Sequence, residues 1–144
     1  MLYVDTSVLV PLVIPEPMSA VVERWFEAAE TGTLMTSGWT TAEFASAIGN
    51  KVRRKELSET SGSEAFSIFE THVVPALRIA TIDETDFRVA AKFMVRFELG
   101  LRAGDALHLA IAQRTAATGL VSLDRRFSDA AQALSLPAML LRSA

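Results

Sequence analysis

The sequence predicts an α/β fold, a three-layer arrangement in which helices flank a central parallel sheet of four to five short strands. Short apolar runs of strand-forming residues alternate along the chain with longer segments whose apolar residues recur at helical spacing. The first run, directly after Met1, is apolar throughout, which is typical of a strand buried on both faces. Regular alternation of strands and helices favours parallel pairing, because parallel neighbours need a crossover between them.

The predicted strands are short and are bounded by turn residues or by the start of a helix. In chain order they are Leu2–Val4, Leu34–Thr36, Leu77–Ala80, Leu120–Ser122 and a last strand at Ala138–Leu141.

The predicted helices carry apolar stripes and end at proline or glycine. Pro11 falls in the first turn of the first helix, where a missing backbone donor matters little, and the Pro15-Glu16-Pro17 segment ends that helix. Ser37 and Gly38 are expected to form a turn after the second strand. In chain order the helices are Ser7–Ile14, Met18–Glu30, Thr40–Leu57, Ser58–Val74, Asp83–Leu99, one from Gly104 to Gly119, and Phe127–Leu134.

Length and composition favour one compact domain over residues 1–144. The chain is 50% hydrophobic and 22% charged, with no recognisable linker or repeat and no cysteine. No apolar run has the length of a membrane span, and no basic segment precedes an apolar one, so we expect a cytoplasmic protein without membrane contact. The net charge of −3 disfavours a coat protein for nucleic acid but leaves open an enzyme that binds divalent cations through carboxylates.

Four of the seventeen acidic residues stand out because their neighbours are apolar or small: Asp5, Glu43, Asp105 and Asp124. Burying an ionised carboxylate costs several kcal/mol unless it is paired, capped or bound to metal. Each of the four has a structural explanation, since Asp5, Asp105 and Asp124 stand at predicted helix starts and can cap them. Glu43 completes a Thr-Thr-Ala-Glu capping box that begins at Thr40.

The four together also suggest a site. Asp5 and Asp124 follow strands that end at the same edge of a parallel sheet, where ligands bind in open α/β folds. The hydroxyl residues Thr6, Ser7 and Ser122 lie beside them. Carboxylates and hydroxyls near helix N-termini suit a hard cation such as Mg²⁺ or Mn²⁺. Sequence spacing alone leaves open whether all four carboxylates meet.

Four short motifs spread over nearly the whole chain make the hypothesis more specific. They are Tyr3-Val4-Asp5-Thr6-Ser7, Ala42-Glu43, Gly104-Asp105-Ala106-Leu107 and Ser122-Leu123-Asp124-Arg125-Arg126-Phe127. In this order they resemble the motifs of the PIN-domain family, and more narrowly those of VapC-type toxins of bacterial toxin–antitoxin pairs. The family usually has threonine two residues before the last acid, where this chain has Ser122.

The resemblance implies a metal-dependent endoribonuclease that is held in check by a small cognate antitoxin and often forms a homodimer. It implies that Mg²⁺ or Mn²⁺ is bound mainly by Asp5 and Asp105, with Glu43 and Asp124 acting directly or through water. Thr6, Ser7 or Ser122 would then orient a carboxylate or a metal-bound water.

Several other polar residues have both a functional and a structural explanation. Arg125 and Arg126 either contact RNA phosphates or begin a solvated helix, and the basic run Lys51–Lys55 is better explained as a solvated helix end than as a phosphate contact. His108 shares a helical face with Asp105, and in so apolar a helix we expect a packed, hydrogen-bonded histidine in preference to a substrate contact.

Two other functions compete with the nuclease hypothesis. A catalytically silent PIN-like module that binds RNA or protein would be expected to have lost one of the four acids. A phosphatase that forms a phosphoaspartate on Asp5 would need a second aspartate two residues later, where this chain has Ser7.

Overall fold

The computed structural model describes all 144 residues, and its centre is a five-stranded parallel sheet with the strand order β3-β2-β1-β4-β5. The α/β prediction is therefore confirmed. The strands are β1 (Leu2–Val4), β2 (Leu34–Ser37), β3 (Arg78–Ala80), β4 (Gly119–Ser122) and β5 (Ala138–Leu140).

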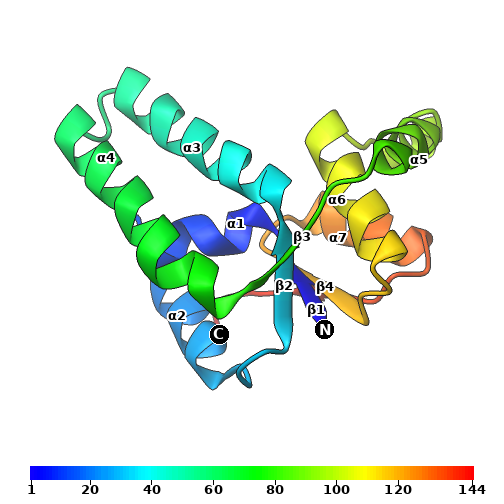
Figure 1. The fold of residues 1–144 in the computed structure, drawn as a ribbon, viewed down its shortest axis with the longest axis horizontal. Coiled ribbons are helices and arrows are strands. Elements are labelled where there is room, and N and C mark those ends of the chain that lie inside the picture. The colour runs from blue at the N-terminus through cyan, green and yellow to red at the C-terminus, as the bar shows by residue number, and fades with distance from the viewer.

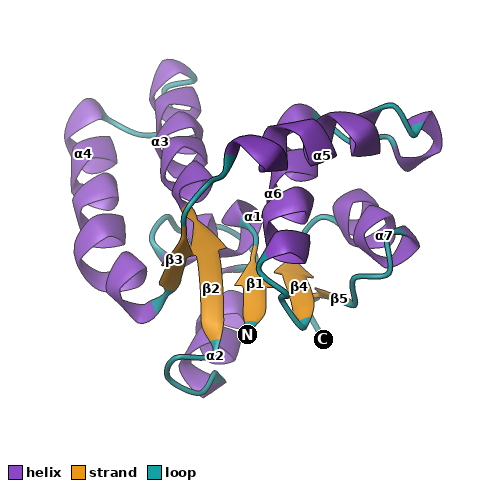
Figure 2. Ribbon diagram, turned by 45° about the vertical axis from the view of Figure 1, so that its right-hand side comes forward, coloured by secondary structure: helices purple, strands orange, loops and turns teal.

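Helices cover both faces of the sheet, and Figures 1 and 2 show the α3–α4 pair on one side and α5, α6 and α7 on the other. The helices are α1 (Thr6–Leu9), α2 (Ser19–Ala28), α3 (Gly38–Arg53), α4 (Glu59–Ile68), α5 (Glu84–Met94), α6 (Ala103–Arg114) and α7 (Arg125–Ala133). Short helical turns at Val10–Leu12, Phe69–Val73, Val74–Ala76 and Phe97–Leu99 extend or connect them.

Each central strand contributes to two separate cores, because successive side chains of a strand point to opposite faces. Tyr3 and Leu120 pack under α5, α6 and α7, whereas Val4 and Val121 pack under α1 to α4. All of these side chains are buried. This explains why the strands are apolar without alternation.

Several predicted boundaries are wrong, and long-range pairing or a left-handed residue explains most of them. Ser37 and Gly38 do not form a turn, because Ser37 pairs with Ala80 of β3 and α3 begins at Gly38. The helix predicted to reach Leu57 ends at Arg53, and Lys55 follows with a φ of 61°.

Helices α5 and α6 also end earlier than predicted. Helix α5 ends at Met94, before a short 3-10 turn that Gly100 closes in the left-handed region, as expected of glycine. Helix α6 ends at Arg114, and Ala116 reverses the chain with a φ of 53°. Gly119 consequently starts β4 and does not end the helix.

The strand order places a topological switch point between β1 and β4. From β1 the chain builds the sheet outward through β2 and β3, and it later returns to the other side of β1 through β4 and β5. All strands end at the same edge, as the arrowheads in Figure 2 show, so the loops after β1 and β4 lie side by side there. Ligands of open α/β sheets bind at this position. None of the helices is both long and apolar enough to cross a membrane.

Candidate active site

The four singled-out carboxylates come together at this edge of the sheet. Asp5 directly follows β1 and Asp124 directly precedes α7, while Glu43 lies in the second turn of α3 and Asp105 in the first turn of α6. Glu43, Asp105 and Asp124 line an open hollow of about 640 Å³. Asp5 lies deeper and is 6% exposed.

Asp5 is held through one carboxylate oxygen. Ser7 and Ser122 both donate hydrogen bonds to its Oδ2, at 2.5 and 2.8 Å. The Oδ1 atom has no hydrogen-bond partner and lies 4.0 Å from His108 Nε2. Asp5 occupies the N-cap position of α1, but its side chain makes no capping hydrogen bond. The capping explanation of Asp5 is therefore wrong.

The same two serines join the loops that follow β1 and β4. While donating to Asp5, Ser7 accepts a hydrogen bond from the Leu123 backbone N–H at 3.0 Å. Ser122 likewise accepts one from the Asp124 backbone N–H at 2.9 Å. The position of the Asp5 carboxylate is thus set by backbone groups of the neighbouring loop, and the loop that carries Asp124 is fixed by the same contacts.

Glu43 is also held through one oxygen, and it is not part of a capping box. Its Oε1 accepts a hydrogen bond from Thr6 Oγ1 at 2.7 Å and another from His108 Nε2. Thr40, the expected partner, instead bonds Thr36 across the start of the helix at 2.6 Å. Burial acts to raise the Glu43 pKa, but the hydrogen bond and charge of His108, together with the Thr6 hydroxyl, outweigh it and lower the pKa.

Asp105 has no hydrogen-bond partner among the side chains, and its pKa is raised to about 6. Burial is the largest cause, and the negative charges of Asp5, Asp124 and Glu43 add to it. The raised pKa of Asp105 therefore reflects the proximity of the other three carboxylates. The predicted cap at Asp105 is absent, since Arg102 occupies the N-cap position of α6.

Asp124 is the one member for which capping is confirmed. Its Oδ1 accepts a hydrogen bond from the backbone N–H of Phe127 at 3.1 Å, at the start of α7. Its side chain is exposed and lines the hollow. A capping role and a position in the site are therefore compatible in this residue.

No lysine or arginine forms a salt bridge with any of the four carboxylates. Arg102 and Arg126 line the hollow, and Arg125 lines only an adjacent hollow beside Leu99 and Gly100, to which Arg126 also contributes. From the basic run, Lys51 instead pairs with Glu16 at 2.9 Å.

The donor set fits a hard divalent cation. Asp5 Oδ1 and Glu43 Oε2 are left without side-chain hydrogen-bond donors, and two further carboxylates border the same hollow. Asp5 and Glu43 belong, with His108, to a group whose nearest ligand atoms lie within 4.8 Å of one another, and Asp105 and Asp124 lie outside this tighter group. Clustered oxygen ligands with uncompensated negative charge are what Mg²⁺ or Mn²⁺ requires.

The sequence analysis did not identify three residues as part of this site, namely Arg102, Trp39 and His108. Arg102 and Trp39 line the hollow, and the indole N–H of Trp39 is buried near the Glu43 carboxylate without the geometry of a hydrogen bond. His108 is buried and hydrogen-bonded, as predicted, but its partner is Glu43. Only its spacing from Asp105 on one helical face gave a signal for this.

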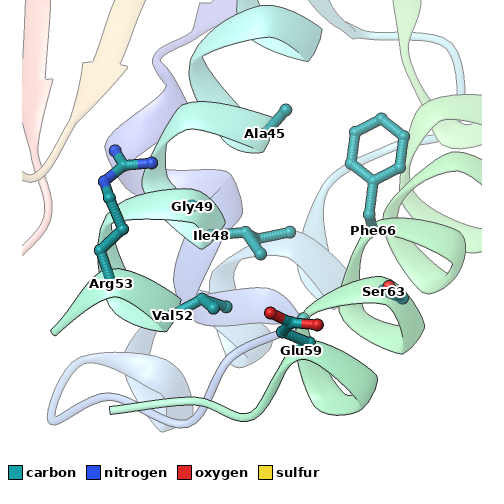
Figure 3. A pocket seen from close by; sticks show the side chains of 9 residues that line it. Ala45, Ile48, Gly49, Val52, Arg53, Glu59, Ser63 and Phe66 are labelled. Atoms are coloured by element: carbon teal, nitrogen blue, oxygen red, sulfur yellow. The ribbon is translucent and has the colours of Figure 1, made fainter. Parts of the chain in front are cut away.

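A second concave surface lies between α3 and α4 and has different chemistry. This groove of about 600 Å³ has an apolar floor that includes Ile48, Val52 and Phe66, with Arg53 and Glu59 at its rim (Figure 3). Glu59 is its one carboxylate and makes no hydrogen bond to Ser63, which also lines the groove. The chemistry of the molecule is therefore concentrated in the acidic hollow at the sheet edge.

Comparisons with known proteins identify the family and agree with the fold. The family model of the PIN domain matches residues 2–133. Ribonuclease VapC35 of Mycobacterium tuberculosis is 31% identical over 142 residues, covering 94% of this chain and 93% of the relative.

Solved structures of low sequence identity share the fold. FitAcB of Neisseria gonorrhoeae superposes with a TM-score of 0.75 at 19% identity, covering 96% of each chain. VapC20 of Mycobacterium tuberculosis, described as a toxin that cleaves the sarcin–ricin loop, has a TM-score of 0.72 at 20% identity and covers 90% of this chain and 95% of its own. VapBC2 of Rickettsia felis, bound to a DNA fragment from its promoter, has a TM-score of 0.65 at 16% identity and covers 99% and 100%.

Proposed function

Because the chain belongs to the PIN-domain family, we propose that it is a metal-dependent endoribonuclease and the toxin of a toxin–antitoxin pair. We propose Asp5, Glu43, Asp105 and Asp124 as its catalytic, metal-binding residues. The motif order, the related VapC ribonuclease and the acidic hollow each support this assignment.

The observation that carries the proposal is the way in which the deepest carboxylates are held. Asp5 and Glu43 each have one oxygen fixed by two donors and a second oxygen free of side-chain donors. A buried carboxylate such as Asp5 that only served packing would have both oxygens satisfied, and the free oxygen of the partly exposed Glu43 faces the same hollow. One fixed and one free oxygen on each of two neighbouring carboxylates is instead the arrangement expected of oriented metal ligands.

A bound Mg²⁺ or Mn²⁺ would polarise the scissile phosphate and lower the pKa of an attacking water. The chain's own residues would hold and orient this centre: Ser7 and Ser122 through Asp5, and Thr6 through Glu43. Asp105 and Asp124 would complete the negative field. Arg126 and Arg102, at the edge of the same hollow, are suited to contact RNA phosphates, whereas Arg125 is a candidate only for a more distant phosphate.

The relatives also suggest the setting in which this activity is used. One solved relative is a VapBC pair on promoter DNA, which supports a small cognate antitoxin as the partner of this chain. We further propose a homodimer that works in the cytoplasm, with residues 1–144 forming one nuclease domain.

The test is cleavage of RNA by the purified protein in Mg²⁺ or Mn²⁺, with EDTA and Asp5→Asn as controls. Cleavage should stop with either control and should persist in Asp129→Asn, which changes an exposed aspartate of α7 outside the four carboxylates. Cleavage that survives both EDTA and Asp5→Asn would contradict the metal mechanism. A wild-type protein that binds RNA but cleaves none would favour the silent-module alternative.

A further inference from the structure

His108 is a buried histidine placed between the proposed catalytic centre and the core. Its ring is completely buried and lies one turn after Asp105 on α6. Nε2 contacts Glu43 Oε1, and Nδ1 lies 2.8 Å from the Tyr3 hydroxyl. The ring therefore joins β1, α3 and α6 through polar contacts at both of its nitrogens.

The geometry around His108 favours a role in supporting Glu43 over a role as a metal ligand. Nε2 is already in hydrogen-bond contact with a carboxylate oxygen, which only accepts, so Nε2 carries a hydrogen and has no lone pair for a cation. Two ligands of one hard cation each lie at least about 2 Å from it, on separate sides. A cation has no place between Nε2 and Oε1.

The ring itself is fixed on the core side. The Tyr3 hydroxyl donates to Ser37 Oγ at 2.9 Å, and its oxygen lies within hydrogen-bond distance of Nδ1, at 2.8 Å. The Tyr3 ring meets the imidazole edge-on, with centroids 5.5 Å apart and an interplanar angle of 66°. Phe127 packs against another side of the ring at 6.3 Å. Rotation of the imidazole would break both nitrogen contacts at once.

We propose that His108 is a positioning residue that fixes Glu43, with Tyr3 fixing His108 in turn. This inference rests on the proposed function, because it concerns the same centre. Together with Thr6, His108 occupies Oε1 of Glu43 and keeps Oε2 in the hollow next to Gly104 and Trp39. A glutamate has three rotatable side-chain bonds, so without these donors its free oxygen would sample many positions.

The expected cost of losing this support is that of other residues that orient metal ligands, about 10- to 100-fold in metal affinity or activity. In His108→Leu we expect a fall in kcat of this size, weaker Mn²⁺ binding and an unchanged KM for RNA. His108→Gln, which can place an amide N–H near the former Nε2, should recover part of both losses. Tyr3→Phe should give a smaller loss in the same direction.

The experiment measures cleavage kinetics and, separately, Mn²⁺ affinity by calorimetry, with circular dichroism to confirm folding. His72→Leu is the matched control, because His72 is exposed and bonds only Thr71. The decisive comparison is a double-mutant cycle with Glu43→Gln: if His108 acts through Glu43, adding His108→Leu to that variant should change kcat and Mn²⁺ affinity no further.

The result that would overturn the inference is a folded His108→Leu with wild-type Mn²⁺ affinity and kcat, or losses that add fully to those of Glu43→Gln. If His108→Leu fails to fold, wild-type values in both His108→Gln and Tyr3→Phe would overturn it equally. Failure of the proposed function is separable, since a wild type without RNA cleavage still leaves the Mn²⁺ titrations to decide the role of His108.

Discussion

Gly104 lies where α6 passes the Glu43 carboxylate, and Gly104→Ala is the most informative single substitution. A Cβ at this position would stand 2.8 Å from Glu43 Oε2 and 3.2 Å from Trp39 Nε1. Normal carbon–oxygen contact requires about half an ångström more than the shorter of these distances. The carboxylate must move, because the helix backbone that carries the new methyl group is the more rigid partner.

The size of the effect follows from how Glu43 is held. Its Oε1 is fixed by Thr6 and His108, so Oε2 can give way only by rotating the carboxylate or by breaking these bonds. A misplacement of about 1 Å can cost about 100-fold in rate, so half of this displacement predicts a loss of about 10-fold or more. Alanine is favoured over glycine in helices by up to about 1 kcal/mol, which offsets the strain in the free energy of unfolding.

We therefore expect Gly104→Ala to fold with nearly wild-type stability and to lose at least about 10-fold in RNA cleavage. Urea unfolding and cleavage kinetics on the same preparation measure the two quantities. Gly38→Ala is the matched control, since Gly38 also lies in the first turn of a helix and a Cβ there meets nothing within 4 Å. Wild-type activity in a folded Gly104→Ala would refute the rigid positioning of Glu43.

Three further predictions concern charge. Asp105→Asn should raise the free energy of unfolding by about 1 kcal/mol at pH 7, a figure discounted for partial solvent screening. The Asp105 pKa is raised to about 6, so the folded state loses stability as the pH rises from about 4 to 6, and the gain from Asn should vanish below about pH 4, where the carboxyl is protonated in both states. Urea titrations at several pH values would show this, and a gain independent of pH would contradict it. Arg114→Leu should lower the free energy of unfolding by about 3 kcal/mol, because the buried Asp86 carboxylate loses its two hydrogen bonds from the guanidinium, at 2.7 and 2.9 Å. The Mn²⁺ affinity should not change. Asp124→Ser should keep the cap of α7, and hence stability within about 0.5 kcal/mol, but weaken Mn²⁺ binding; equal Mn²⁺ affinity would remove Asp124 from the metal site.

The sheet could be predicted because its strands obey a local rule. Residues such as Tyr3, Val4, Leu120 and Val121 lie between helices on both faces, so their strands are apolar without interruption and stand out in the sequence. Helix ends were predicted less well, because they depend on single backbone conformations. Lys55, for example, adopts a φ of 61° although its type gives no sign of it.

The proposed site could be predicted in its members but not in its contacts. Asp5 and Asp124 follow adjacent parallel strands, so their proximity is a consequence of topology. The capping-box alternative for Glu43 is wrong, although Thr40 and Glu43 have the spacing of such a box. In the structure the long-range contact with Thr6 replaces the local one, as tertiary contacts often do. His108 lies 65 residues from Glu43 and 105 from Tyr3, and no local pattern could have predicted that it joins them.

Carboxylates lie in different environments at the two ends of helix α6, one paired with an arginine and one without a cationic partner. At its C-terminal end Arg114 meets the buried Asp86 with two hydrogen bonds and also bonds the Thr81 carbonyl oxygen at 2.6 Å, so the buried charge is fully compensated. At its N-terminal end Asp105 has no cationic partner and faces three other acids that raise its pKa. Arg102 and Arg126 line the same hollow, but neither forms a salt bridge with any of the four carboxylates. The chain pairs the carboxylate that serves packing and leaves the cluster unpaired, which is the distribution expected if a divalent cation supplies the missing positive charge.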